Sequence, residues 1–187
     1  MTKAFNLLVM MVMTLAFNNA YASIYSKEGA ARNILKTRPQ KPIYTLFGRI
    51  VIRAAVILVS TAAVIAVYGT VSSAHTSEAV LMGVITLLVS EAHLLWCAEM
   101  DIMRNFADQY QTVGLQSDSP NERNATIISF LLAALFAFLY YFLSDVGLFG
   151  QNGSVSSLLK GLAIAVLFTA ARVYLFVIRA KLYFVEK

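Results

Sequence analysis

Four ionisable side chains lie inside long apolar runs of the sequence: Arg53, Glu91, His93 and Arg172. A charge at the centre of a membrane costs about 2.5–3.5 kcal/mol on insertion scales and usually faces a partner or water. Glu91 and His93 could exchange protons in an ion or proton pathway. Alternatively, Glu91 pairs with Arg172 at similar depth, and Arg53 joins them by snorkelling. We favour this structural network, because a pathway normally needs polar groups at several depths.

Other chemistry finds little support among the residue types. The two histidines, His75 and His93, are 18 residues apart, or about 27 Å along one helix, so they cannot share a haem or a zinc ion. His93 alone could be a core histidine bonded to a backbone carbonyl. The single cysteine, Cys97, excludes an internal disulfide or a CxxC pair. No GxSxG, HExxH, P-loop or GxGxxG motif occurs. We therefore expect no cofactor, no metal and no enzymatic activity.

The composition is that of an integral membrane protein. Of the 187 residues, 59% are hydrophobic and 13% are charged, whereas soluble domains carry about 25% charged residues. The mean hydropathy of +0.69 agrees. These values exclude a disordered chain, a soluble nucleic-acid binder and an ordinary cytosolic enzyme. The net charge of +5 does not indicate nucleic acid, because Lys and Arg flank apolar runs, where they meet lipid head groups.

Four segments are long and apolar enough to be transmembrane helices, which need about 20 residues. They cover residues 47–68, 79–98, 125–144 and 158–178. The sequence thus predicts an all-α, polytopic membrane helical bundle with four core transmembrane helices, within residues 49–187. A basic segment, residues 26–48, precedes them.

A fifth apolar stretch lies at the N-terminus, in residues 1–25. Lys3 precedes the apolar run, and Ala20-Tyr21-Ala22 precedes Ser23. This layout is typical of a secretory signal peptide, but an uncleaved membrane helix over residues 4–25 fits equally. The distribution of Lys and Arg favours the uncleaved helix. Cleavage before Ser23 would start the basic segment outside and invert the positive-inside rule.

The preferred threading has three cytoplasmic segments: residues 27–53, residues 99–124 and the C-terminal tail. Residues 99–112 show helical spacing of apolar residues, so an amphipathic inner helix is expected there. On its polar face, Arg104 would pair with Asp101 at i,i+3 spacing and with Asp108 at i,i+4 spacing. Ser119-Pro120-Asn121-Glu122 then predicts a capping box that opens the third core helix.

Small residues recur at spacings of three and four in two of the spans. Such stripes let helices approach closely in lipid. They could pack helices within one chain or join the chain to other subunits. The residues are Ala55, Val59, Ala62, Ala66 and Gly69 in the first core span, and Gly161, Ala165 and Thr169 in the fourth.

Three function classes remain. We expect a non-catalytic integral membrane subunit of a larger assembly, for example a secretion or conjugation-type complex. The alternative is a small oligomeric channel or transporter using Glu91, His93 and Arg172. A membrane enzyme with Glu91 and His93 as acid and base is the third. The expected partners are the lipid bilayer and other membrane subunits or copies of the chain, but not nucleic acid. The expected location is a bacterial inner membrane.

Overall fold

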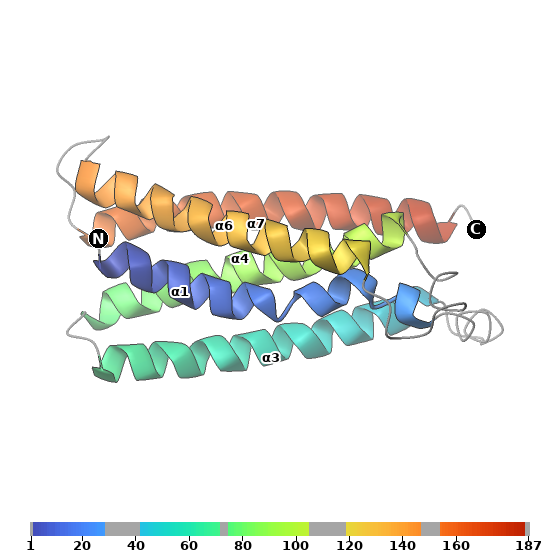
Figure 1. Cartoon of the computed structure of the whole chain (residues 1–187), viewed down its shortest axis with the longest axis horizontal. Coiled ribbons are helices and arrows are strands. Elements are labelled where there is room, and N and C mark those ends of the chain that lie inside the picture. The colour runs from blue at the N-terminus through green and yellow to red at the C-terminus, as the bar shows by residue number, and fades with distance from the viewer. Residues whose placement is uncertain (1, 29–41, 72–74, 105–118, 147–153, 186–187) are drawn as a thin grey trace.

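The computed structural model describes residues 2–28, 42–71, 75–104, 119–146 and 154–185. Five helices within these ranges are long and apolar enough to cross a membrane. The first of these spans, Thr2–Ser23, consists of α1 (Thr2–Ala16) and the short helix that follows it. The other four spans lie on α3 (Pro42–Val71), α4 (Thr76–Met103), α6 (Pro120–Tyr141) and α7 (Ser154–Val185) (Figure 1). The structure therefore confirms the prediction of an all-α, multi-pass membrane bundle, with four core helices and one helix near the N-terminus.

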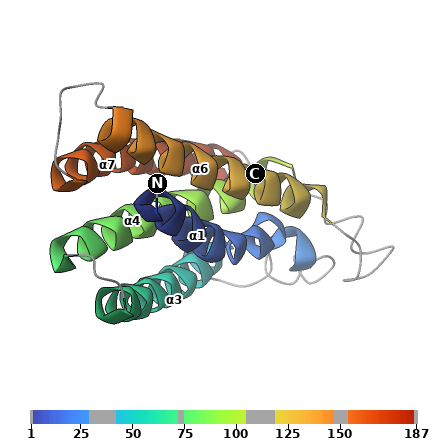
Figure 2. The same ribbon diagram turned by 60° about the vertical axis from the view of Figure 1, so that its left-hand side comes forward.

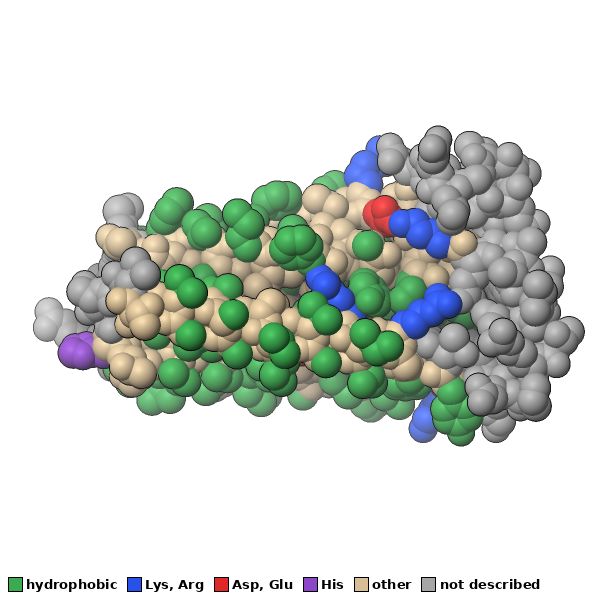
Figure 3. Space-filling view, turned by 90° about the horizontal axis from the view of Figure 1, so that it is seen from below, with side chains coloured by type: hydrophobic (Ala, Val, Ile, Leu, Met, Phe, Trp, Pro, Cys, Tyr) green, Lys and Arg blue, Asp and Glu red, His purple; other side chains and the backbone are tan. Residues whose placement is uncertain are grey.

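The helices run up and down along one long axis (Figure 1). α3 and α6 begin, and α4 and α7 end, at the same end of the bundle, which we call the basic end. Its described cations are Lys27, Arg49, Arg104, Arg123, Arg179 and Lys181. Figure 3 shows Lys and Arg gathering toward this end of one face, while apolar side chains cover the remaining length. The positive-inside rule predicts that this end is cytoplasmic.

α4 is the central helix of the bundle, and α7, α3 and α1 pack around it. α1 lies between α6 and the α3–α4 pair (Figure 2). Its buried residues Leu7, Met11 and Leu15 join the main core cluster with Met82 and Val89 of α4. Packing of α1 as a bundle helix supports the membrane-helix alternative, and its retention in the mature chain stays a prediction.

The chain after α1 departs from the helix expected over residues 4–25. α1 ends at Ala16, and two short 3-10 helices follow, Asn19–Ser23 and Ser26–Glu28. Polar contacts explain the break. The Asn18 side chain donates to the Ser90 carbonyl of α4 at 2.9 Å, and Asn19 donates to the Thr126 hydroxyl of α6 at 3.0 Å. The segment thus bonds to neighbouring helices in place of continuing its own helix.

Asp101 corrects the expectation of a polar helix face at residues 99–112. α4 continues to Met103, but Asp101 is fully buried. Its carboxylate accepts hydrogen bonds from the backbone N–H groups of Tyr25 and Ser26 and from the Ser26 hydroxyl. Asp101 therefore holds the segment after α1 against α4 by hydrogen bonds and does not pair with Arg104. The remainder of the expected amphipathic helix, residues 105–112, lies outside the described residues.

The capping box at the start of α6 is also corrected. Ser119 occupies the N-cap position with extended backbone and Pro120 is the first helical residue, as predicted, but the Ser119 side chain makes no capping hydrogen bond. Glu122 does not reach back to Ser119 either. Its carboxylate accepts a hydrogen bond from Ser23 and lies 2.6 Å from the Lys27 ammonium. The glutamate anchors the segment after α1 to α6.

Gly83 sets the distance between α3 and α4. A Cβ atom built on Gly83 would lie 2.0 Å from the Ile65 side chain of α3. We expect Gly83→Ala to lower the free energy of unfolding by about 1–3 kcal/mol, the usual cost of overpacking. Thermal unfolding in detergent measures it. Gly69→Ala is the matched control, since nothing lies within 4 Å of a Cβ at Gly69. Equal stability of the two variants would contradict the close approach.

Candidate functional site: the intramembrane charges

Glu99 is the centre of a buried ion cluster between α4 and α7. Its side chain is 1% exposed, and its two carboxylate oxygens pair with Arg172 and Arg179. Arg172 is 9% exposed and its guanidinium carbon lies 4.2 Å from the centre of the Trp96 ring. A carboxylate with two hydrogen-bonded guanidinium partners and a cation–π contact is a satisfied charge. The cluster links two helices and gives each carboxylate oxygen of Glu99 a cationic partner.

The expected pairing of Glu91 with Arg172 is therefore wrong. The reason is the rotation of α4. Ile85, Leu88 and Trp96 mark the side of α4 that faces α7: Gly161 packs near Ile85, Thr169 donates to the Leu88 carbonyl at 3.1 Å, and Arg172 stacks on Trp96. Glu91 follows Gly83 by eight residues, about two turns, and so lies on the side that faces α3.

Glu91 and Arg53 meet at the α3–α4 contact. Glu91 is half-buried, and Arg53 is the cation that acts on it electrostatically. Within the described residues the two do not form a salt bridge. The Arg53 guanidinium carbon lies 5.8 Å from the Phe17 ring centre and 5.9 Å from the Tyr21 ring centre. Two members of the predicted network thus lie together, separate from Arg172.

His93 lies on the opposite side of α4, fully buried toward α6. Its ring nitrogen Nε2 is 3.6 Å from the Cys97 sulfur, and the ring interacts with the backbone of Ala125. The structure therefore does not bring His93 together with Glu91. Its surroundings are those of the core histidine that the sequence allowed as an alternative.

The two small-residue stripes lie in different places. In α7, Gly161 and Ala165 are buried, with Ile85 of α4 3.6 Å from a Cβ built on Gly161. In α3 the stripe is exposed along its whole length, and two further exposed residues extend it toward the basic end. We call this set the outer seam: Gly48, Ile52, Ala55, Val59, Ala62, Ala66 and Gly69.

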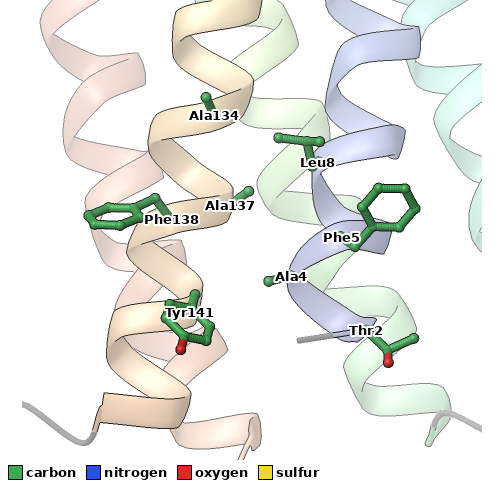
Figure 4. A pocket seen from close by; sticks show the side chains of 8 residues that line it. All are labelled: Thr2, Ala4, Phe5, Leu8, Ala134, Ala137, Phe138 and Tyr141. Atoms are coloured by element: carbon green, nitrogen blue, oxygen red, sulfur yellow. The ribbon is translucent and has the colours of Figure 1, made fainter.

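An apolar groove of about 600 Å³ lies between α1 and α6, near the end opposite the basic end (Figure 4). Short side chains on both helices leave it open. Its lining contains no charged group, so it is not a candidate for chemistry. The lining residues are Thr2, Ala4, Phe5, Leu8, Ala134, Ala137, Phe138 and Tyr141.

Sequence reasoning missed Glu99, Arg179 and Trp96. Glu99 follows the expected end of the span at residue 98, so the hydropathy pattern predicts it in the cytoplasmic loop. The helical spacing of Trp96, Glu99 and Met103 could have placed all three on one face. Arg172 and Arg179 are seven residues apart, two turns on one face of α7. Two such arginines on one helix, with a carboxylate on another helix, form a pattern that predicts an ion cluster.

Comparison with known protein families, with curated proteins and with solved structures gives no match to this chain. Among the described residues, no three His, Cys, Asp or Glu side chains lie close enough to hold a metal ion. The candidate functional features are therefore those of the bundle itself: the Glu99 cluster, the Arg53–Glu91 region and the outer seam.

Proposed function

We propose that this chain is a non-catalytic integral membrane subunit of a larger assembly, and that the outer seam of α3 is its contact with another membrane-spanning helix. The single observation that carries the proposal is the exposed seam. Its seven residues follow a strict 4-3-4-3-4-3 spacing, which is the a/d pattern of left-handed helix pairs. Five of the seven are Gly or Ala.

Contact with lipid does not explain why small residues recur on this exposed face. In a membrane no hydrophobic force drives helices together, so close packing through small residues is a main source of association. The chain uses such a stripe in α7, where Gly161 and Ala165 pack on α4. The equivalent stripe in α3 packs on nothing within the described residues. A helix from a second copy or from another subunit is the partner that fits it.

The buried charges agree with a structural role. The carboxylates of Glu78, Glu99 and Glu122 are all engaged in ion pairs between segments. These pairs fix the register of α1, α4, α6 and α7. We place the assembly in a bacterial inner membrane, with a secretion or conjugation-type complex as the working example.

Substituting Ala62 by leucine tests the proposal. The added side chain points away from the bundle, so thermal stability of the isolated chain should change by less than about 0.5 kcal/mol. The contact should be lost, and the particle mass in mild detergent should fall to that of one chain. Light scattering after size exclusion measures the mass, and mass spectrometry identifies co-purifying proteins.

Ala170→Leu is the matched control for that experiment. Ala170 is an exposed alanine of α7 away from the seam, and its substitution should leave the assembly intact. The proposal fails if Ala62→Leu retains the same mass and the same co-purifying proteins as the parent chain.

The alternative of a small oligomeric channel or transporter now depends on Glu91 alone. Glu91 is half-buried inside α4 and, among the described residues, makes no hydrogen bond. Such a carboxylate could serve ion transfer between copies of the chain. Loss of ion flux through liposomes in Glu91→Gln, with stability unchanged, would favour this alternative.

A further inference from the structure

Arg53 is a cation without an acceptor. The guanidinium carries five N–H donors, yet within the described residues none of them makes a hydrogen bond or a salt bridge. Its Nε atom is buried and lacks any partner. The Nε atom of Arg172 also lacks a partner, but the Arg172 guanidinium donates a hydrogen bond to the Glu99 carboxylate through Nη2. Arg53 is half-buried, and withdrawing a charge from water without such a partner is expensive, so the surroundings of Arg53 are incomplete.

The depth of Arg53 limits what can complete them. It lies six residues into the span that begins at Phe47, about 9 Å from the basic end of that span. Arginine side chains snorkel over such distances toward the head groups. Arg49 lies one turn nearer the basic end on the same side of α3 and reaches the Ile24 carbonyl at 3.4 Å. The guanidinium groups of Arg53 and Arg49 thus lie one after the other on the same side of α3, in the direction of the head groups.

The Arg53 guanidinium lies between α3 and the segment that follows α1. Phe17 and Tyr21 of that segment have their ring centres 5.8 Å and 5.9 Å from the guanidinium carbon. Glu91 lies deeper. Because Ile65 contacts Gly83 in this antiparallel pair, counting eight residues along each helix places Glu91 level with Ile57, one turn beyond Arg53. The basic end is therefore the side of Arg53 away from Glu91, and an acceptor at the head-group level would approach Arg53 from that side.

We propose that Arg53 and Arg49 bind the phosphate group of a phospholipid from the leaflet at the basic end, with Arg53 as the main ligand and Arg49 as the second. Phosphate oxygens match the planar donor fork of arginine. Phe17 and Tyr21 present aromatic surface to the upper part of the acyl chains. The site is independent of the outer seam, since Arg53 lies on the inward side of α3 with Ile50 and Ile57.

The test measures lipid binding to the full-length chain in detergent. Native mass spectrometry compares dioleoylphosphatidylglycerol with dioleoylglycerol, which has the same chains and no phosphate. The parent chain should bind the phospholipid at least about ten-fold more tightly. Arg53→Gln should lose that preference, since hydrogen bonds to charged groups are worth about ten-fold or more. Inorganic phosphate at equal concentration should not compete, which separates a lipid from a free anion.

Arg123→Gln is the control, because Arg123 is an exposed arginine of α6 at the same end and not part of the Arg53–Arg49 pair on α3. It should retain the preference. Arg53→Met combined with Glu91→Met leaves no lone charge at the α3–α4 contact and guards against misfolding of the single variant. It should also lose the preference. The proposal is overturned if either Arg53 variant still binds the phospholipid more tightly than dioleoylglycerol. It is also overturned if the parent chain releases a bound protein and no lipid.

Discussion

Replacement of Glu99 by glutamine should lower the free energy of unfolding of the bundle by about 3–5 kcal/mol, the cost of breaking a buried ion pair from one side. Glutamine keeps the shape of the side chain but removes its charge. Arg172, which is 9% exposed, would then be a buried cation without a counter-ion. Arg179 is 40% exposed and can turn toward water. Thermal unfolding in detergent should show a midpoint lower by roughly 10 °C.

Glu91→Gln is the matched control for this prediction. It makes the same chemical change two helical turns earlier on the same helix, at a carboxylate that forms no hydrogen bond among the described residues. Its effect on stability should be much smaller. Glu99→Met with Arg172→Met should recover part of the loss, because it removes the buried pair entirely. Equal losses in Glu99→Gln and Glu91→Gln would show that the cluster does not hold α4 to α7.

The spans could be predicted from the sequence because a bilayer permits few solutions. Each crossing segment must satisfy its own backbone hydrogen bonds, so about 20 apolar residues predict a helix. The helix ends could not be read in the same way. α4 continues through Glu99 and Asp101 to Met103, although these carboxylates read as the start of a loop. Each is neutralised or hydrogen-bonded by a segment distant in sequence, which hydropathy cannot register.

The charged residues show a second limit. Depth in the membrane is a count along the sequence, and on that count Glu91, His93 and Arg172 belong together. Rotation about the helix axis decides which side chains meet. α4 contacts α3, α6 and α7 on different sides, so Glu91, His93 and Glu99 face three different surroundings. The packing of Gly83 against Ile65 and the hydrogen bond from Thr169 to the Leu88 carbonyl are two of the contacts that fix that rotation.

The small-residue stripes show why pattern alone leaves burial open. Ala62 and Ala66 in α3 and Gly161 and Ala165 in α7 have the same spacing of four. The α7 pair is buried and the α3 pair is exposed. The spacing states that a helix can pack closely on that side. It does not state whether the partner belongs to the same chain.

The mature protein should retain α1, so its intact mass should be that of a chain that begins at Met1 or Thr2. Leu7, Met11 and Leu15 are among the most deeply buried side chains of the bundle, and their loss would leave a trough along α4 and α6. The loss of Asn18 would also leave the Ser90 carbonyl without the side-chain donor that it has in the bundle. Intact-mass measurement of membrane-extracted protein tests this directly. A mature chain that begins at Ser23 would contradict it and would make residues 1–22 a secretory signal.

Ala20→Leu sharpens the same test. A leader peptidase needs small residues in the A-x-A site, so leucine at position 20 would block cleavage. Ala20 is exposed, and the substitution should leave the fold unchanged. If α1 is retained, the parent chain and Ala20→Leu differ in mass only by the substitution itself. If α1 is normally removed, Ala20→Leu accumulates as a longer chain. The comparison therefore decides between a fifth bundle helix and a discarded leader without relying on the stability of either form.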